Sequence, residues 1–150
     1  MSRRVELREG TDRYVLLLEG ATAVYRDRLE GSIRSRFNNQ INGFLFEDTP
    51  ESALEDEDKF PTPLRQLKDR GGKVRGLGVW CQGSGYDVFV VQVIYNKEKD
   101  EDKILAKAGK FQGRAQKWDD EISNKDNELI EAKIDDWERN PDIEVFKNPE

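Results

Sequence analysis

Histidine is absent from this chain of 150 residues, and cysteine occurs once, as Cys81. Ser-His-Asp and Cys-His catalysis and zinc-finger sites are therefore excluded, because each needs an imidazole or several thiols. An intramolecular disulfide is excluded because it needs a second thiol. Apolar runs are also short: none approaches the roughly 20 residues of a membrane-spanning helix, and no signal-peptide core follows the first four residues. We therefore expect a soluble, cytoplasmic protein with no membrane partner.

Hydrophobic residues are scarce as well, at 35% against 37% charged residues. Seven Phe, three Trp and four Tyr nevertheless provide more aromatic surface than a disordered tail carries. A chain of this length suits one core. The sequence therefore predicts a single folded domain over residues 1–150, with a small core and a strongly polar surface.

The net charge of -6 is distributed unevenly along the chain. Residues 47–58 carry seven acids and no base, and the segment after residue 118 is acidic too. Basic residues concentrate in residues 60–86, where Asp69 is the one acid, and in residues 103–117, which contain no acid. Two interpretations stay open: the basic segments bind a polyanion, or they are solvated faces of an acidic domain.

The first half of the chain predicts strands followed by one long helix. Residues 5–9 and 13–19 are extended in pattern, with a turn between them. From Val24/Tyr25 onward, apolar residues recur every four positions through Leu29, Ile33, Phe37 and Ile41, which predicts an amphipathic helix of about twenty residues. We expect Gly31 to be its weak interior point and its end to lie near residues 42–43. Residues 47–59 predict a mobile acidic surface loop, and residues 64–70 predict a short helical turn.

The second half predicts a meander and a last helix. Residues 73–81 and 86–95 are β-type runs joined by a short Gly-rich connection, the pattern of a hairpin. Residues 103–108 predict a third antiparallel strand, and residues 109–118 are ambiguous. A capping box at residues 123–126 and an apolar stripe through Ile130, Ile134 and Trp137 predict an acidic helix over residues 123–139. The fold class is therefore α+β: a small antiparallel sheet with an N-terminal and a C-terminal helix packed on it.

This order of elements resembles that of the RelE/ParE-like toxin superfamily, in which a strand and helices precede an antiparallel meander and a C-terminal helix. Residues 63–68 resemble the leucine-and-base segment before the sheet of that family. Residues 79–80 and 83–88 resemble its second-to-third strand hairpin, and residues 107–117 fall where the family has a basic segment. The resemblance covers residues 13–118. The sequence departs from the family pattern at two places. Asp87 stands where the family commonly has Arg, and the His of the His-Arg pair that often follows the last strand has no counterpart here.

The resemblance implies a toxin-like ribonuclease that cleaves ribosome-associated mRNA and is restrained by an antitoxin protein. The adjacent 2′-hydroxyl is the nucleophile in such enzymes, and without His the contributors are Lys, Arg, Tyr and carboxylates. The catalytic candidates are Arg75, Lys110, Arg114, Tyr86 and Tyr95. Basic residues beside aromatic ones also suit single-stranded RNA, and the RNA-binding candidates are Lys73, Lys107, Phe111, Lys117 and Trp118.

Other interpretations of the sequence give the same candidate residues structural roles. Tyr86 and Tyr95 suit ordinary sheet positions, and Phe111 and Trp118 suit anchors of the last helix. The whole chain would then be a non-enzymatic interaction module whose acidic loop and acidic C-terminal helix bind a basic protein. The ribonuclease interpretation expects four basic residues to converge near Tyr86 or Tyr95: Lys73, Arg75, Lys110 and Arg114.

No cofactor and no metal are expected. The acidic segments at residues 47–58 and 99–102 lack the glycine and the alternating spacing of a calcium loop. The glycines at positions 76, 78, 83 and 85 lie on a hairpin, so they do not form a phosphate-binding loop between a strand and a helix. Cys81 lacks the neighbouring His that would favour a nucleophilic thiol.

Overall fold

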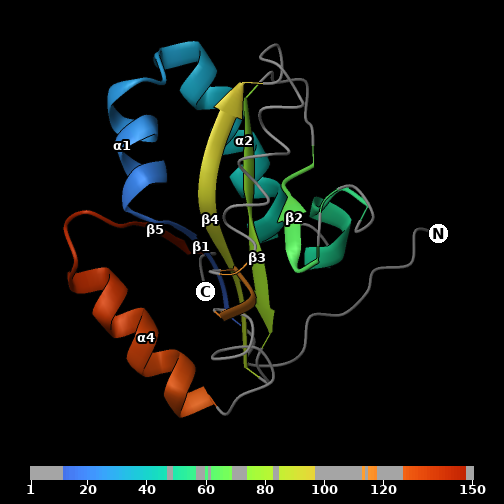
Figure 1. The fold of residues 1–150 in the computed structure, drawn as a ribbon, viewed down its shortest axis with the longest axis vertical. Helices are drawn as coiled ribbons and strands as arrows, with labels where there is room; N and C mark the ends of the chain where they lie inside the picture. The colour runs from blue at the N-terminus through green and yellow to red at the C-terminus, as the bar shows by residue number, and fades with distance from the viewer. Residues whose placement is uncertain are drawn as a thin grey trace.

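The computed structural model of the chain describes residues 12–46, 49–56, 60, 62–68, 74–82, 85–96, 113, 115–117 and 127–147. Within these residues, helices and a five-stranded mixed sheet pack together, so the predicted α+β class is confirmed. Figure 1 shows the sheet running through the middle of the molecule, with α1 (Glu19–Asp27) at its upper end and α4 (Asn127–Arg139) at its lower end.

The sheet has the strand order β2-β3-β4-β1-β5. Its strands are β1 (Asp12–Leu17), β2 (Leu64–Gln66), β3 (Val74–Gln82), β4 (Tyr86–Asn96) and β5 (Glu144–Lys147). Strands β2, β3 and β4 form an antiparallel meander, β1 runs parallel to β4, and β5 runs antiparallel to β1. The sequence predicts a wholly antiparallel sheet, and this is wrong at the β1–β4 pair. The helices and two strands that lie between β1 and β4 provide the long crossover that parallel neighbours need.

The two faces of the sheet hold separate cores. One face, called the helix face below, is covered by α1 and by α2 (Gly31–Phe46); Phe89 and Val91 of β4 pack there with Phe37. The opposite face, called the α4 face, packs Val88 and Val90 of β4 with side chains of α4. Coverage on both faces explains why β4 and β1 are apolar at nearly every position.

A β-bulge sets the register of β3 against β4. Leu77 is paired with Val93 and Gly78 with Val91, so Gln92 is an extra residue on β4. At Gly78 the two backbones approach closely, since an added Cβ would lie 2.0 Å from the carbonyl oxygen of Val90. Only glycine fits at this position.

The predicted single long helix is instead two helices, α1 and α2. Helix α1 ends at Asp27, and the backbone N–H of its C-cap residue Arg28 donates to the carbonyl of Val24. Helix α2 then begins at Gly31, the residue that the sequence marks as the weak point. The four-residue apolar repeat is also not buried along its whole length: within α2, Phe37 is fully buried, whereas Ile33, near the start of the helix, is 38% exposed. The second helix also continues to Phe46, beyond the predicted end.

Two further predictions are wrong around β2. The expected helical turn at residues 64–70 is a strand at Leu64–Gln66, paired with Leu77–Val79 of β3. The expected mobile loop at residues 47–59 contains the 3-10 helix η1 (Pro50–Ala53), followed by a bridge between Leu54 and Leu67. Both Ala53 and Leu54 are buried in the helix-face core, so this segment is ordered by packing and covers the outer edge of β2.

The hairpin and the last helix are confirmed. Strands β3 and β4 match the two predicted β-runs within one residue, and α4 ends at Arg139, before Asn140. Its predicted start at residues 123–126 lies outside the described residues, as do the predicted strands at residues 5–9 and 103–108. Gly113 and residues 115–117 are helical, within the stretch that is ambiguous in the sequence. Strand β5 has no counterpart among the predicted elements.

Candidate functional site at the β2–β3 edge

Arg75 and Tyr95 are the two predicted catalytic residues that the structure brings together. They are direct partners in the register of β3 and β4. An added Cβ on Gly76 would meet Phe37 and Leu67 on the helix face, so the neighbouring Arg75 points to the α4 face. Tyr95 packs against the α4-face core, and Arg75 is only 1% exposed.

Polar partners from the edge of the sheet complete what we call the Arg75 cluster: Arg75, Tyr95, Glu55 and Gln66. The hydroxyl of Tyr95 donates to Oε1 of Gln66. One carboxylate oxygen of Glu55 lies 3.7 Å from Nη1 of Arg75, and the backbone N–H of Glu55 donates to the carbonyl of Gln66. A guanidinium, a carboxylate and a phenol therefore share one end of the α4 face. These groups can stabilise negative charge and move protons.

Tyr86 lies at the other end of β4 and belongs to a different environment. Nine positions separate it from Tyr95, which is about 30 Å along a strand. Its hydroxyl donates a 2.6 Å hydrogen bond to Glu131 of α4. Burial, this hydrogen bond and the charge of Glu131 raise the pKa of the Tyr86 phenol well above its usual range. Tyr86 therefore joins β4 to α4, and it does not lie beside Arg75.

Asp87, the first departure from the family pattern, faces away from the Arg75 cluster. It is 4% exposed, follows Tyr86 at the start of β4, and accepts a 3.2 Å hydrogen bond from the indole Nε1 of Trp80. Its neighbours in register are Arg13 of β1 and Gln82 of β3. Since Phe89, two positions on, lies in the helix-face core, Asp87 shares that face and is not placed to repel a phosphate at Arg75.

Most of the remaining predicted site residues lie outside the described residues: Lys73, Lys107, Lys110, Phe111, Arg114 and Trp118. Lys117 is described, and its side chain is exposed in the helical residues 115–117. The expected convergence of the basic residues with Arg75 therefore stays a prediction.

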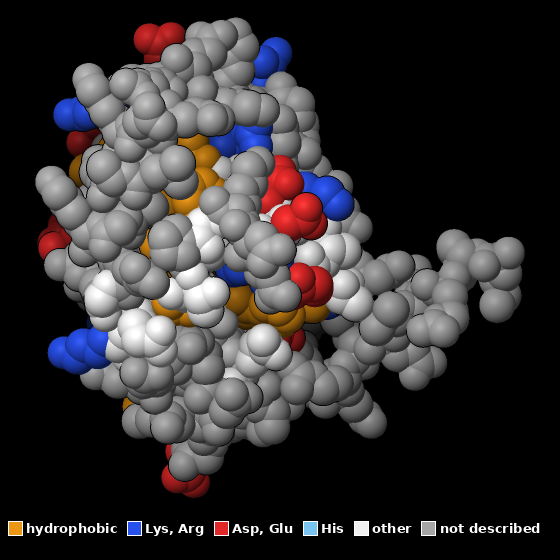
Figure 2. All heavy atoms as spheres, turned by 45° about the vertical axis from the view of Figure 1, so that its right-hand side comes forward, with side chains coloured by type: hydrophobic (Ala, Val, Ile, Leu, Met, Phe, Trp, Pro, Cys, Tyr) orange, Lys and Arg blue, Asp and Glu red, His pale blue; other side chains and the backbone are white. Residues whose placement is uncertain are grey.

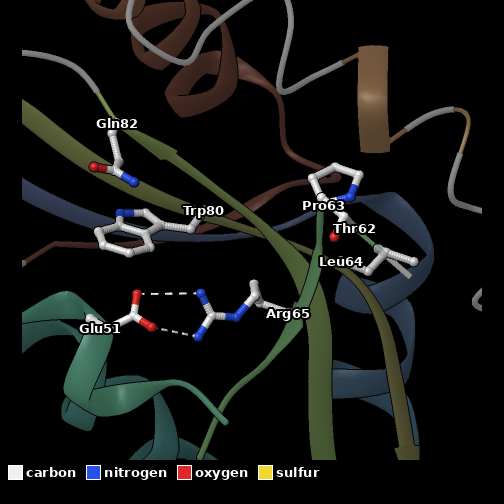
Figure 3. A pocket seen from close by; sticks show the side chains of 7 residues that line it. All are labelled: Glu51, Thr62, Pro63, Leu64, Arg65, Trp80 and Gln82. Atoms are coloured by element: carbon white, nitrogen blue, oxygen red, sulfur yellow. Dashed lines mark hydrogen bonds and ion pairs between the residues drawn. The ribbon is translucent and has the colours of Figure 1, made fainter. Parts of the chain in front are cut away.

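The structure also places a pocket of about 290 Å³ on the helix face of the same edge, which the sequence does not indicate (Figure 3). Leu64 lies in the α4-face core, so its neighbour Arg65 points to the helix face. Arg65 donates two hydrogen bonds to the carboxylate of Glu51, at 3.3 and 2.9 Å. Trp80 and Gln82 of β3 line the pocket beside this pair, and the remaining wall consists of Thr62, Pro63 and Leu64.

Glu55 connects the pocket with the Arg75 cluster. Its backbone carbonyl accepts a 2.8 Å hydrogen bond from Nη2 of Arg65, while its carboxylate pairs with Arg75 on the other face. Glu51 of η1 pairs with Arg65 on the helix face, and Glu55, which follows the bridge residue Leu54, pairs with Arg75 on the α4 face. Figure 2 accordingly shows acidic and basic side chains next to one another on its right-hand side.

The sequence did not indicate the pair of Arg65 with Glu51, because the pair depends on strand β2, which the sequence pattern did not predict. The two residues are 14 positions apart, and residues 64–70 have helical spacing of their leucines.

No group of three or more Cys, Asp or Glu side chains in the described residues is arranged to hold a metal ion. Among the helices in the described part of the chain, none is long and apolar enough to cross a membrane. Comparison of the chain with protein-family models, curated proteins and solved structures finds no match.

Proposed function

We propose that this protein is a toxin-like ribonuclease that cleaves ribosome-associated mRNA, and that the Arg75 cluster is part of its active site. The observation that carries the proposal is the pairing of Arg75 with Tyr95 on one face of the sheet, beside the carboxylate of Glu55. The order of elements supports it: β1, two helices, an antiparallel meander and α4 follow one another as the RelE/ParE-like resemblance implies.

The cluster contains the groups that this reaction needs. The 2′-oxygen attacks phosphorus as its proton passes to a base, for which the carboxylate of Glu55 is suited. The guanidinium of Arg75 stabilises the additional negative charge on the phosphoryl oxygens. The hydroxyl of Tyr95 gives a proton to the departing 5′-oxygen, so the products are a cyclic phosphate and a 5′-hydroxyl. In this proposal Lys110 and Arg114 add positive charge, and Tyr86 has no role because it lies at the far end of β4.

The proposal includes a cytoplasmic location and an antitoxin partner. An antitoxin that covers the β2–β3 edge beside Glu55 would separate the Arg75 cluster from RNA. In this proposal the RNA-binding candidates after β4 contact the same RNA: Lys107, Phe111, Lys117 and Trp118.

Controlled expression in a bacterial host tests the proposal. The wild-type chain should arrest growth and leave cleaved mRNA, mapped by primer extension. Arg75→Gln and Tyr95→Phe should each relieve the arrest, because they remove the positive charge and the transferable proton. The matched control is Arg139→Gln, since Arg139 is an exposed arginine of α4 paired with Asp136. Normal growth and intact mRNA at high levels of the folded wild-type protein contradict the proposal.

A second candidate function, a module that binds a basic protein, is favoured by one observation. The exposed acids of α4 outnumber its exposed bases; they are Glu128, Glu131, Asp135, Asp136 and Glu138. The acidic segment before β2 supports it less, because Glu51 and Glu55 pair with arginines of the chain itself. A Lys-rich model peptide should then bind in a salt-sensitive manner, and Asp135→Asn with Glu138→Gln should weaken it. Binding that these changes leave unaltered contradicts this candidate.

A further inference from the structure

A short acidic segment crosses the outer edge of β2 and reaches both faces of the sheet. It comprises residues 50–56, which contain η1 and are called the strap below. Within the described residues, two backbone hydrogen bonds attach the strap to this edge. The N–H of Glu55 donates to the carbonyl of Gln66 at 2.9 Å, and the N–H of Lys68 donates to the carbonyl of Ala53 at 2.7 Å. An element attached in this way can open locally while the sheet stays folded.

Arg65 fastens the strap at two points. Its guanidinium donates to both carboxylate oxygens of Glu51, at 3.3 and 2.9 Å, and Figure 3 shows this pair. It also donates to the backbone carbonyl of Glu55 at 2.8 Å. These charge-assisted hydrogen bonds are made only while the strap lies on the edge. The Glu51–Arg65 pair is therefore the latch of the strap, and loss of the Glu51 carboxylate should favour opening.

The other end of the strap places a carboxylate against Arg75. One oxygen of Glu55 lies 3.7 Å from Nη1 of Arg75, and the two side chains are 23% and 1% exposed. The carboxylate of Glu55 therefore lies between the guanidinium and water. A guanidinium uses the same N–H donors for a carboxylate and for a phosphate. Because 3.7 Å is longer than a hydrogen bond, a phosphate that forms hydrogen bonds with Arg75 can compete for this position.

We propose that the strap is an autoinhibitory element of this protein. In the closed strap Glu55 occupies the phosphate position at Arg75, and opening of the strap admits the RNA backbone. The inference rests on the proposed ribonuclease function, since it concerns access to the same site. The displaced carboxylate of Glu55 stays beside the bound phosphate, where the proposed reaction needs its base. The Glu51–Arg65 latch sets the fraction of molecules in which the strap is open.

Amide hydrogen exchange of the full chain, followed residue by residue by NMR, tests whether the strap opens. Glu51→Gln should accelerate exchange of the Glu55 and Lys68 amides roughly 5- to 30-fold, the factor expected when a charge-assisted pair is lost from the closed state. The N–H of Leu67 is the internal control, because it donates to a carbonyl of β3 and stays bonded when the strap opens. The matched control variant is Glu128→Gln, an exposed acid of α4, which should change none of these amides.

Labelling with the arginine reagent phenylglyoxal, mapped by mass spectrometry, tests access to Arg75. In the wild type Arg75 should react more slowly than Arg139, whose side chain is 76% exposed. In Glu51→Gln the rate at Arg75 should rise by the same factor as exchange of the Glu55 amide, since one opening controls both, and the rate at Arg139 should not change. With the proposed ribonuclease function, Glu51→Gln should also arrest growth at a lower level of expression than the wild type.

The outcomes separate the strap from the ribonuclease. Unchanged exchange at Glu55 and Lys68, in a Glu51→Gln protein with a native circular dichroism spectrum, overturns the strap. Equal acceleration at Leu67 overturns it too, because β2 itself would then unfold, and so does wild-type labelling of Arg75 that is as fast as labelling of an exposed arginine. A strap that opens as expected in a protein that leaves growth and mRNA intact refutes the ribonuclease alone. Cleavage of mRNA by a protein whose Arg75 labelling does not respond to Glu51→Gln refutes the strap alone.

Discussion

The hydroxyl of Tyr86 donates a 2.6 Å hydrogen bond to Oε1 of Glu131, which joins the first residue of β4 to the middle of α4. Tyr14 of β1 packs beside it, with 6.2 Å between the ring centroids. Burial is the main cause that raises the pKa of both phenols. The contact therefore couples the docking of α4 to the neutral form of Tyr86.

This coupling predicts a loss of stability at alkaline pH. Because the pKa of Tyr86 is raised in the folded protein, its contribution is complete below the unfolded value of about 10 and declines as pH rises above it. The free energy of unfolding, measured with urea from pH 7 to 11, should therefore fall above about pH 10. Tyr86→Phe should fall less steeply, and Glu131→Gln should be intermediate because it keeps an acceptor but removes the charge. Parallel curves for the wild type and Tyr86→Phe would contradict the role of this phenol.

The close approach of Gly78 to β4 predicts a large effect of one methyl group. In Gly78→Ala the new Cβ would lie 2.0 Å from the carbonyl oxygen of Val90, so the β3–β4 register must shift. We expect a loss of more than about 3 kcal/mol in the free energy of unfolding. Gly20→Ala in α1 is the matched control, because nothing lies within 4 Å of its new Cβ. Alanine stabilises a helix by about 0.5–1 kcal/mol relative to glycine. Similar costs at both positions, measured by urea unfolding, would show that the backbones do not meet at Gly78.

The hairpin and α4 were predictable because their signals are local. Glycines between two β-type runs define the turn, and a stripe at helical spacing defines the buried side of α4, where Ile130, Ile134 and Trp137 are all buried. Neither signal depends on residues distant in the sequence.

Strand β2 was not predictable in the same way, because its leucine spacing fits two structures. Leu64 and Leu67 are three positions apart, which places them on one side of a helix but on opposite faces of a strand. In the structure Leu64 lies in the α4-face core and Leu67 in the helix-face core. Pairing with β3 and burial on both faces therefore outweighed the local pattern. The pocket depends on this strand, so it could not be derived from the sequence.

The Glu51–Arg65 pair should contribute more to stability than an exposed pair on α4. The Arg65 side chain is 10% exposed and donates hydrogen bonds to both carboxylate oxygens of Glu51, whereas Arg139 and Asp136 are 76% and 68% exposed. A double-mutant cycle with Glu51→Gln and Arg65→Met should give a coupling energy of about 1–2 kcal/mol. The corresponding cycle with Asp136→Asn and Arg139→Met should give less than about 0.5 kcal/mol. Equal coupling in the two cycles would mean that burial of Arg65 adds nothing to the pair.

The two isoleucines of α2 are unequally buried, although the four-residue repeat treats them alike. Ile41 is 1% exposed in the helix-face core, and Ile33, in the first turn of the helix, is 38% exposed. Ile41→Ala should reduce the free energy of unfolding by about 2–5 kcal/mol, because it leaves a cavity among packed side chains. Ile33→Ala should cost less than about 1 kcal/mol, since most of what it removes is in contact with water. The two variants remove the same atoms from the same helix, so the difference measures burial alone. Equal costs in urea unfolding would contradict the difference in burial between the two side chains.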